Sequence, residues 1–377
     1  MIDLLRDKLA DGIQHTGIQV GAYTSSGRNN MIFNNMEFHN VEELEVVPGL
    51  GGYKLQRFPS QLRHSLGHKD HERGRFYAQK SVGCEIRFVT AAKFIWISLS
   101  ALEQDGRVLV YKGEFLHSTH LLKAGVITTL HLEEPPHFNN IDPEYLQGDS
   151  FSPQVWRFQF GKECNIVFHH LDTFGHDVNP PHENEKPSRR WLAYGSSITF
   201  GGDTCTYNNA YVQQTANRMK VDVYNKGIAG SCFCEKQIAH YISSHSQWDF
   251  VTLELGINMR GRFTVEEYEN RVRYLLQTIV EENPDKPVVA IGIYPNGADY
   301  SLQIDDPMTK ANQDFIEISK RVGADIGHKN LHFVYGDKVL TDFSGLSTDL
   351  VHPSDYGHSI MAENLSKILQ QILEREA

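Results

Sequence analysis

Two short stretches in the C-terminal half of the sequence contain the side chains that acyl transfer requires. Gly195-Ser196-Ser197 offers small hydroxyls beside a glycine, and Asp349-Leu-Val-His352 places an imidazole three residues after a carboxylate. A serine oxygen becomes a nucleophile when an imidazole removes its proton, and a carboxylate holds that imidazole in the required orientation. The two stretches indicate nucleophilic catalysis, while Gly-Ser-Ser alone also fits an ordinary turn.

Two further stretches supply hydrogen-bond donors for an anionic oxygen. The loop 225–231 contains two glycines, including Gly230, that let the backbone approach a substrate and donate an N–H group. Gly256-Ile-Asn258 adds a neutral amide donor, which brings no charge that would pair with a catalytic base. Each stretch also fits a plain turn, so the chemical interpretation depends on their meeting at one place.

The spacing of aspartate and histidine is not unique in this sequence, which has 19 histidines. Asp-x-x-His recurs at Asp325 and His328, and again at Asp355 and His358. The first pair precedes an expected strand, so it falls at the opposite edge of a parallel sheet from the serines. The second pair begins the last expected helix, and topology does not exclude it as the base and its partner.

Alternating strands and helices after residue 185 must position these side chains. The helix from Thr264 is the clearest, because Thr264-Val-Glu-Glu267 has the form of a capping box and apolar residues then recur on one face. The alternation predicts a doubly wound, flavodoxin-like α/β domain with a five-stranded parallel sheet, whose ligands collect at the carboxyl ends of the strands. The expected strands lie at residues 191–194, 221–224, 250–255, 288–293 and 331–335.

The sequence before the polar, proline-containing stretch 179–189 has a different period. Short segments rich in β-branched and aromatic residues, separated by turn residues, predict an all-β sandwich or jelly roll. We therefore predict a β-sandwich domain over residues 1–182 and an α/β domain over residues 183–377. The expected strands of the first domain include residues 84–89, 94–99, 107–111, 126–132 and 165–170.

Composition and charge exclude several classes of function. The 377-residue chain has 36 Lys plus Arg against 47 Asp plus Glu, a formal net charge of −11, which argues against nucleic acid as a partner. Charges interrupt the first nine positions, and no stretch approaches the roughly 18 apolar residues of a membrane span, so neither a signal peptide nor a membrane segment is expected. Five scattered cysteines without a C-x-x-C pair favour a reducing cytoplasm.

Two other clusters carry candidate chemistry that the sequence does not favour. His64, His68 and His71 have spacings compatible with a metal site, but their charged neighbours indicate a solvated loop instead. Cys232 and Cys234 adjoin the Gly230 loop, and a small apolar role is the better interpretation of both. We expect neither a metal nor a cofactor.

The four stretches together resemble the sequence blocks of the SGNH (GDSL-type) hydrolases, in the same order. The resemblance extends from about residue 190 to the C-terminus. It implies Ser197 as the nucleophile, His352 as its base and Asp349 as the partner of that base. It also implies an oxyanion hole formed by the N–H groups of Ser197 and Gly230 and by the side chain of Asn258.

Two positions depart from the family's pattern, and three more are candidates for the substrate cleft. Ser196 stands where the family usually has Asp, and Met259 follows the oxyanion asparagine where Asp is frequent. Neither position belongs to the implied triad. Arg260, Arg262 and Tyr294 follow expected strand ends, so we list them as residues that line the cleft.

The front half, with Gly113-Glu-Phe and Phe151-Ser-Pro-Gln-Val-Trp-Arg157, resembles two-domain members of the family that include carbohydrate esterases and a polyketide-tailoring acyltransferase. The resemblance implies a serine esterase that cleaves a small-acyl ester, such as one of an acetylated carbohydrate, through an acyl-serine. An acyltransferase and a non-catalytic carbohydrate-binding protein remain as alternatives. The expected partner is a small-molecule or carbohydrate ester, and homo-oligomerisation is left open.

Overall fold

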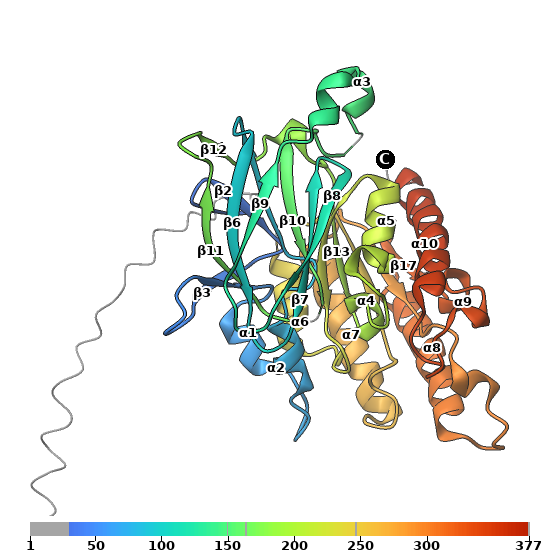
Figure 1. Ribbon diagram of the computed structural model, residues 1–377. Coiled ribbons are helices and arrows are strands. Elements are labelled where there is room, and N and C mark those ends of the chain that lie inside the picture. Colours follow the sequence, from blue (N-terminus) through green and yellow to red (C-terminus); the bar gives the residue numbers. More distant parts are fainter. Residues whose placement is uncertain (1–29, 149, 163, 246, 376–377) are drawn as a thin grey trace, which may run out of the picture.

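The computed structural model describes residues 30–148, 150–162, 164–245 and 247–375. Its N-terminal half has two antiparallel sheets around an apolar core, and its C-terminal half has a parallel sheet flanked by helices (Figure 1). This confirms the predicted fold class. The expectation that the first nine residues form no signal peptide concerns residues outside those described. Among the described helices, none combines the length and the apolar character that a membrane crossing requires.

The sandwich core lies between a seven-stranded and a five-stranded sheet. The larger sheet has the order β1-β2-β5-β10-β7-β8 with β12 paired to β5, and the smaller has the order β3-β4-β11-β6-β9. In β6, Ile95, Ile97 and Leu99 are buried while Phe94 and Trp96 face outward, the alternation expected of a half-buried strand. The strands are β1 Met31–Phe33, β2 Met36–His39, β3 Glu43–Val46, β4 Tyr53–Gln56, β5 Glu85–Thr90, β6 Phe94–Ala101, β7 Gly106–Lys112, β8 Phe115–Leu122, β9 Thr128–Glu133, β10 Val155–Phe160, β11 Ile166–Asp172 and β12 Val178–Asn179.

The parallel sheet has the order β14-β13-β15-β16-β17, which is the flavodoxin-like order 2-1-3-4-5. Helices α5 and α10 pack together over one face, and α6, α7 and α8 cover the other. The strands are β13 Arg190–Gly195, β14 Asp222–Gly227, β15 Phe250–Glu254, β16 Val288–Ile291 and β17 Leu331–Val334. The helices are α4 Ser197–Phe200, α5 Tyr211–Met219, α6 Lys236–Ser244, α7 Val265–Glu282, α8 Pro307–Ile326, α9 Gly336–Val339 and α10 Asp355–Arg375.

The capping box that the sequence predicts at the start of α7 is present. The Thr264 hydroxyl accepts a hydrogen bond from the Glu267 N–H at 3.1 Å, and the Glu267 carboxylate accepts one from the Thr264 N–H at 2.8 Å. The apolar residues that follow face the core. They are Tyr268, Val272, Leu275, Leu276 and Ile279.

Three short helices of the N-terminal half are absent from the sequence-based prediction: α1 Ser60–Ser65, α2 Arg73–Ala78 and α3 Pro143–Leu146. Helix α1 contacts α6 of the α/β domain, so the stretch from α1 to α2 crosses to the other half of the molecule. The charged residues around His68 and His71 are exposed, as predicted for a solvated loop, but the two histidines are half-buried. Their rings pack against Phe263 and Phe233, with centroids 4.4 and 5.2 Å apart.

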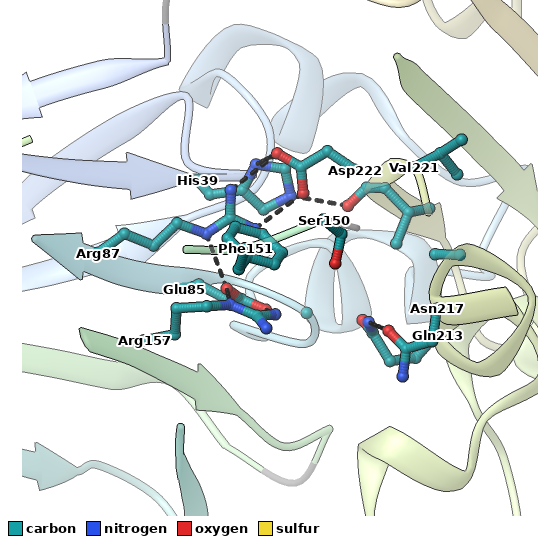
Figure 2. A pocket seen from close by; sticks show the side chains of 13 residues that line it. His39, Glu85, Arg87, Ser150, Phe151, Arg157, Gln213, Asn217, Val221 and Asp222 are labelled. Carbon is teal, nitrogen blue, oxygen red and sulfur yellow. Dashed lines mark hydrogen bonds and ion pairs between the residues drawn. The ribbon is translucent and has the colours of Figure 1, made fainter. Parts of the chain in front are cut away.

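A buried cluster of charges joins the two halves (Figure 2). Arg87 of β5 binds both carboxylate oxygens of Asp222 in β14, at 2.7 and 2.8 Å, and also contacts Glu37 and Glu85. Arg157 of β10 pairs with Glu85 at 2.8 Å. These side chains stand on the face of the larger sheet that points away from the sandwich core, so that face is an interface with the α/β domain.

Candidate active site

Ser197 lies at the turn from the first parallel strand into a short helix. Strand β13 ends at Gly195, and the Ser196 hydroxyl caps α4 by accepting a hydrogen bond from the Ile198 N–H at 3.1 Å. Ser196 is fully buried and is committed to this cap, whereas Ser197 is half-buried. The turn thus presents the second serine, and not the first, at the carboxyl edge of the sheet.

The structure brings His352 and Asp349 to that serine from the other end of the domain. Ser197 Oγ lies 2.7 Å from His352 Nε2, and His352 Nδ1 lies 2.5 Å from Asp349 Oδ2. Because the carboxylate accepts from Nδ1–H, Nε2 remains to accept the serine proton. The Ser347 N–H binds the His352 carbonyl at 2.7 Å and holds the turn closed.

Hydrogen bonds keep the Asp349 carboxyl ionised. Its Oδ1 accepts from the N–H groups of Val351 and His352 at 2.9 and 3.0 Å. Partial burial alone would raise the pKa of Asp349, but these bonds and the one from the imidazole outweigh it and lower the pKa below its usual value. A permanent carboxylate at this place favours the imidazolium that forms when His352 takes a proton.

Asn258 and Gly230 lie at the same edge with their donors available. Asn258 Oδ1 accepts a hydrogen bond from the Cys232 N–H at 3.1 Å, so its Nδ2 group points the other way. Gly230 adopts φ = +68°, a conformation that glycine takes without strain. In the part of the chain that the structure describes, no hydrogen bond uses the Gly230 N–H or Asn258 Nδ2. Both donors are free for a substrate oxygen.

The sequence reasoning missed a buried carboxyl beneath the serine turn. Glu254, the last residue of β15, accepts from the Ser196 N–H at 2.6 Å and from the Thr199 hydroxyl at 3.1 Å. Its burial raises the pKa of the carboxyl. A Cβ on Gly195 would lie 2.5 Å from this carboxylate, which explains the glycine before the serines. The sequence feature that could have revealed this carboxyl is a glutamate at the end of a buried, mainly apolar strand.

The two other Asp-x-x-His pairs lie away from the serine oxygen. His358 is fully buried, and its Nδ1 accepts from the Tyr211 N–H at 3.1 Å while Nε2 donates to the Gly202 carbonyl at 3.0 Å. Burial lowers the pKa of His358 to about 4, so it is a neutral structural ring. His328 precedes β17, where its Nδ1 accepts from the Asn330 N–H at 3.3 Å.

Two of the three residues expected at the substrate cleft make contacts inside the protein. Tyr294 is 2% exposed, and its hydroxyl donates to Tyr211 within the core under α5 and α10. Arg260 donates to the side-chain oxygens of Asn296 and Asn312 at 3.0 and 2.7 Å, so it holds a loop together. A residue's position after a strand end predicts the sheet edge at which it lies. It does not tell whether the side chain points into the protein or outward. Arg262 is exposed.

Arg73 reaches the Gly230 loop from the sandwich domain, a contact that the sequence analysis did not predict. A Cβ built on Gly230 would lie 3.3 Å from the Cζ of Arg73, so the guanidinium rests against the backbone of that loop. Next to it, His71 Nδ1 lies 3.2 Å from the Ser231 hydroxyl. The rim of the site is therefore built by both halves of the chain.

The described residues contain two groups with the donor types of a metal site. Glu37, His39 and Asp222 form one, but the Arg87 guanidinium already bridges the two carboxylates, so a cation does not fit there. Asp203, Asp349 and His352 form the other, at the triad itself, where His352 Nδ1 is engaged by Asp349. His64, His68 and His71 do not form such a group among the described residues.

Comparisons with known proteins give the family that the α/β half resembles and the solved structures that share the fold. Residues 188–370 match the model of the GDSL-like Lipase/Acylhydrolase family. A salicylyl-acyltransferase from a tetracycline biosynthetic pathway has a similar structure, with a TM-score of 0.74 and 16% identity over 93% of this chain and 96% of that one. No curated protein sequence matches the chain.

Two further solved structures share the two-part architecture. A GDSL-like lipase structure from Bacteroides ovatus has a TM-score of 0.63 and 16% identity, over 90% of this chain and 98% of that one. A family two carbohydrate esterase from Cellvibrio japonicus has a TM-score of 0.59 and 13% identity, over 91% and 96%. At these identities the likeness establishes the fold. The family match is confined to the α/β half: residues 188–370 are similar to the GDSL-like lipase/acylhydrolase family.

Proposed function

We propose that the protein is a serine esterase that cleaves a small-acyl ester through an acyl-serine intermediate. The observation that carries this proposal is the continuous contact from Ser197 Oγ to His352 Nε2, at 2.7 Å, and from His352 Nδ1 to Asp349, at 2.5 Å. A hydroxyl, an imidazole and a carboxylate in this order form the arrangement that activates a serine oxygen.

In the first half of the proposed reaction, Ser197 Oγ attacks the ester carbonyl while His352 Nε2 takes the hydroxyl proton. The N–H groups of Ser197 and Gly230 and the Asn258 amide hold the oxygen that becomes negative. Collapse of the tetrahedral intermediate breaks the bond to the alcohol, which receives the proton from His352. Water then attacks the acyl-serine with the same base, releasing the acid and restoring Ser197.

The ester substrate is proposed to carry a short acyl group such as acetyl, on a carbohydrate or another small alcohol. Support comes from structural neighbours whose names describe them as family two carbohydrate esterases and an acetyl xylan esterase. A second candidate is transfer of the acyl group to a specific alcohol instead of water. It is favoured by the salicylyl-acyltransferase, whose fold matches over nearly the whole chain.

A panel of aryl esters from acetyl to decanoyl, together with acetylated sugars, tests the proposal. Wild-type protein should hydrolyse the short esters, Ser197→Ala should reduce turnover by at least 10³-fold, and Ser196→Ala serves as the neighbouring control. Product analysis with added alcohols separates hydrolysis from transfer. A wild type inactive on every ester, with or without an acceptor, would contradict the proposal and favour a non-catalytic carbohydrate-binding protein.

A further inference from the structure

A segment of the sandwich domain forms part of the rim around the proposed oxyanion site. The guanidinium of Arg73 rests on the Gly230 backbone, where an added Cβ would lie 3.3 Å from Cζ and 3.4 Å from Nε. The contact is fixed on both sides: His71 binds the Ser231 hydroxyl at 3.2 Å, and a Cβ on Gly74 would lie 3.2 Å from the Ser231 Cβ. Packing of the backbone around Arg73 therefore places its guanidinium beside Gly230.

A second arginine, Arg262 of the α/β domain, lies near His71. Arg262 follows the Asn258 loop, and its neighbour Phe263 packs against Phe233 and His68. The pKa of His71 is lowered first by burial, then by the positive charges of Arg262 and Arg73. His71 therefore lies within the field of both guanidinium groups, which come from different domains.

Nearby arginines are held by hydrogen bonds or ion pairs with other residues, whereas Arg73 and Arg262 have no such carboxylate or amide partner within the described ranges. Arg75 pairs with Glu72 at 2.5 Å, Arg260 is held by two asparagines, and Arg271 donates to the Phe233 carbonyl at 2.9 Å. The Arg73 side chain donates a hydrogen bond to the Tyr77 hydroxyl at 3.4 Å, and both Arg73 and Arg262 are exposed. Among the described residues, neither guanidinium has a carboxylate partner. Arg73 and Arg262 are thus two exposed positive charges without a carboxylate partner, in a chain whose formal net charge is −11.

We propose that Arg73 and Arg262 form a subsite for an anionic group of the substrate, a carboxylate or a phosphate. Guanidinium groups bind both anions through paired N–H donors, and a position beside Gly230 places the anion within one substrate length of the scissile ester. The inference rests on the proposed function and deepens it, since it assigns the enzyme an acidic ester as its substrate class.

Three matched pairs of esters, each a charged substrate and its neutral counterpart, test the subsite and locate the charge. 4-Nitrophenyl hemiglutarate and its methyl ester carry the difference on the acyl side, and 4-acetoxybenzoate and its methyl ester carry it on the alcohol side. Acetylated glucose 6-phosphate and acetylated glucose supply the phosphate. We expect the charged member of at least one pair to have a roughly 10- to 100-fold higher kcat/KM, and the advantage to shrink in 1 M salt.

Substitutions assign that advantage to the two arginines. Arg73→Gln and Arg262→Gln should each reduce the charged-to-neutral ratio of kcat/KM at least fivefold, and Arg262→Glu should reverse it. Arg75→Gln, on the same helix as Arg73 but paired with Glu72, is the matched control and should leave the ratio unchanged. Because the two arginines lie in different domains, misfolding of one variant leaves the other as a test.

A binding measurement separates failure of the subsite from failure of the esterase proposal. Calorimetric titration of Ser197→Ala with 4-acetoxybenzoate, hemiglutarate and glucose 6-phosphate should show binding of a charged probe that is lost on adding Arg73→Gln. If wild type hydrolyses esters but neither rates nor binding depend on the probe's charge, the subsite is wrong. If no ester is hydrolysed but a charged probe binds through Arg73, the subsite stands and the esterase proposal fails.

Discussion

At the scale of single residues, the direction of the Asn258 amide decides its proposed role. Its oxygen is held by the Cys232 N–H, so only the nitrogen is available for a substrate. We expect Asn258→Ala to lower kcat by about 10²- to 10³-fold, because one donor to the oxyanion is lost. Steady-state kinetics checks this, and a urea midpoint close to wild type shows that folding is intact. Wild-type turnover in the variant would remove Asn258 from the oxyanion hole.

His352 and His358 have the same spacing from an aspartate but opposite expected phenotypes. His352→Ala should abolish activity with little change in stability, because the ring is partly exposed and its proposed task is proton transfer. His358→Ala should cost about 2–3 kcal/mol of unfolding free energy, because two buried backbone groups lose their partner. Urea denaturation and ester assays on both variants check the pair. Loss of activity in a fully folded His358→Ala protein would reverse the assignment.

Which residues could be predicted depended on where they stand in the chain. Ser197, Gly230 and Asn258 each follow a parallel strand, so topology alone places them at one sheet edge, where the structure also has them. Arg73 and Glu254 could not be found in this way. Arg73 reaches the rim through packing between domains, and Glu254 acts from inside a strand, where the sequence pattern indicates only burial.

At the scale of elements, the stretch from α1 to α2 shows why local pattern was insufficient. Its histidines and charged residues have the composition of an exposed loop, yet it is ordered by aromatic contacts with Phe233 and Phe263 of the other domain. The five parallel strands and the capped helix α7, by contrast, carry their own signals in short apolar runs and a capping box. The sequence-based prediction missed α1 and α2, whose order depends on contacts with the other domain.

Glu235, the N-cap residue of α6, makes the contact between the α1–α2 stretch and the α/β domain dependent on pH. Its Oε1 accepts from the Gly67 N–H at 3.2 Å, and burial raises its pKa from 4.5 to about 7. The folded protein therefore holds the proton more tightly than the unfolded chain, so this carboxyl lowers stability as pH rises from about 4.5 through 7. We expect Glu235→Gln, which keeps the acceptor, to be more stable than wild type at pH 8 and nearly equal at pH 5. Urea midpoints at both pH values check this, and a difference independent of pH would contradict it.

At the scale of the whole molecule, the two halves are joined by charges taken out of water. Arg87 and Asp222 are separated by 135 positions in the chain, and both are almost completely buried. The same guanidinium contacts Glu37 and Glu85, which also pair with Lys186 and Arg157. The sequence predicted two domains, but it could not predict this interface, because an arginine in a strand looks like an outward-facing residue until the second domain covers it.

Removal of Arg87 is expected to destabilise both halves together. Arg87→Ala leaves the buried Asp222 carboxylate without its two-bond partner and removes one of the cations beside Glu37 and Glu85, which costs about 3–5 kcal/mol of unfolding free energy. Arg273→Ala is the matched control, since its ion pairs with Glu269 and Asp325 are largely exposed and should contribute below about 1 kcal/mol. Equilibrium unfolding in urea measures both. Equal, small losses in the two variants would show that the buried cluster does not join the halves.

The stretch from α1 to α2 brings Arg73 of the sandwich domain against the Gly230 loop, and this has a consequence for how related genes can diverge. If this stretch selects the substrate, a few codon changes there can give a homologous protein a different substrate specificity. The codons for Ser197, His352 and Asp349 then need not change. Exchange of this stretch between homologous genes is then the shortest route to an enzyme with a different substrate and the same chemistry.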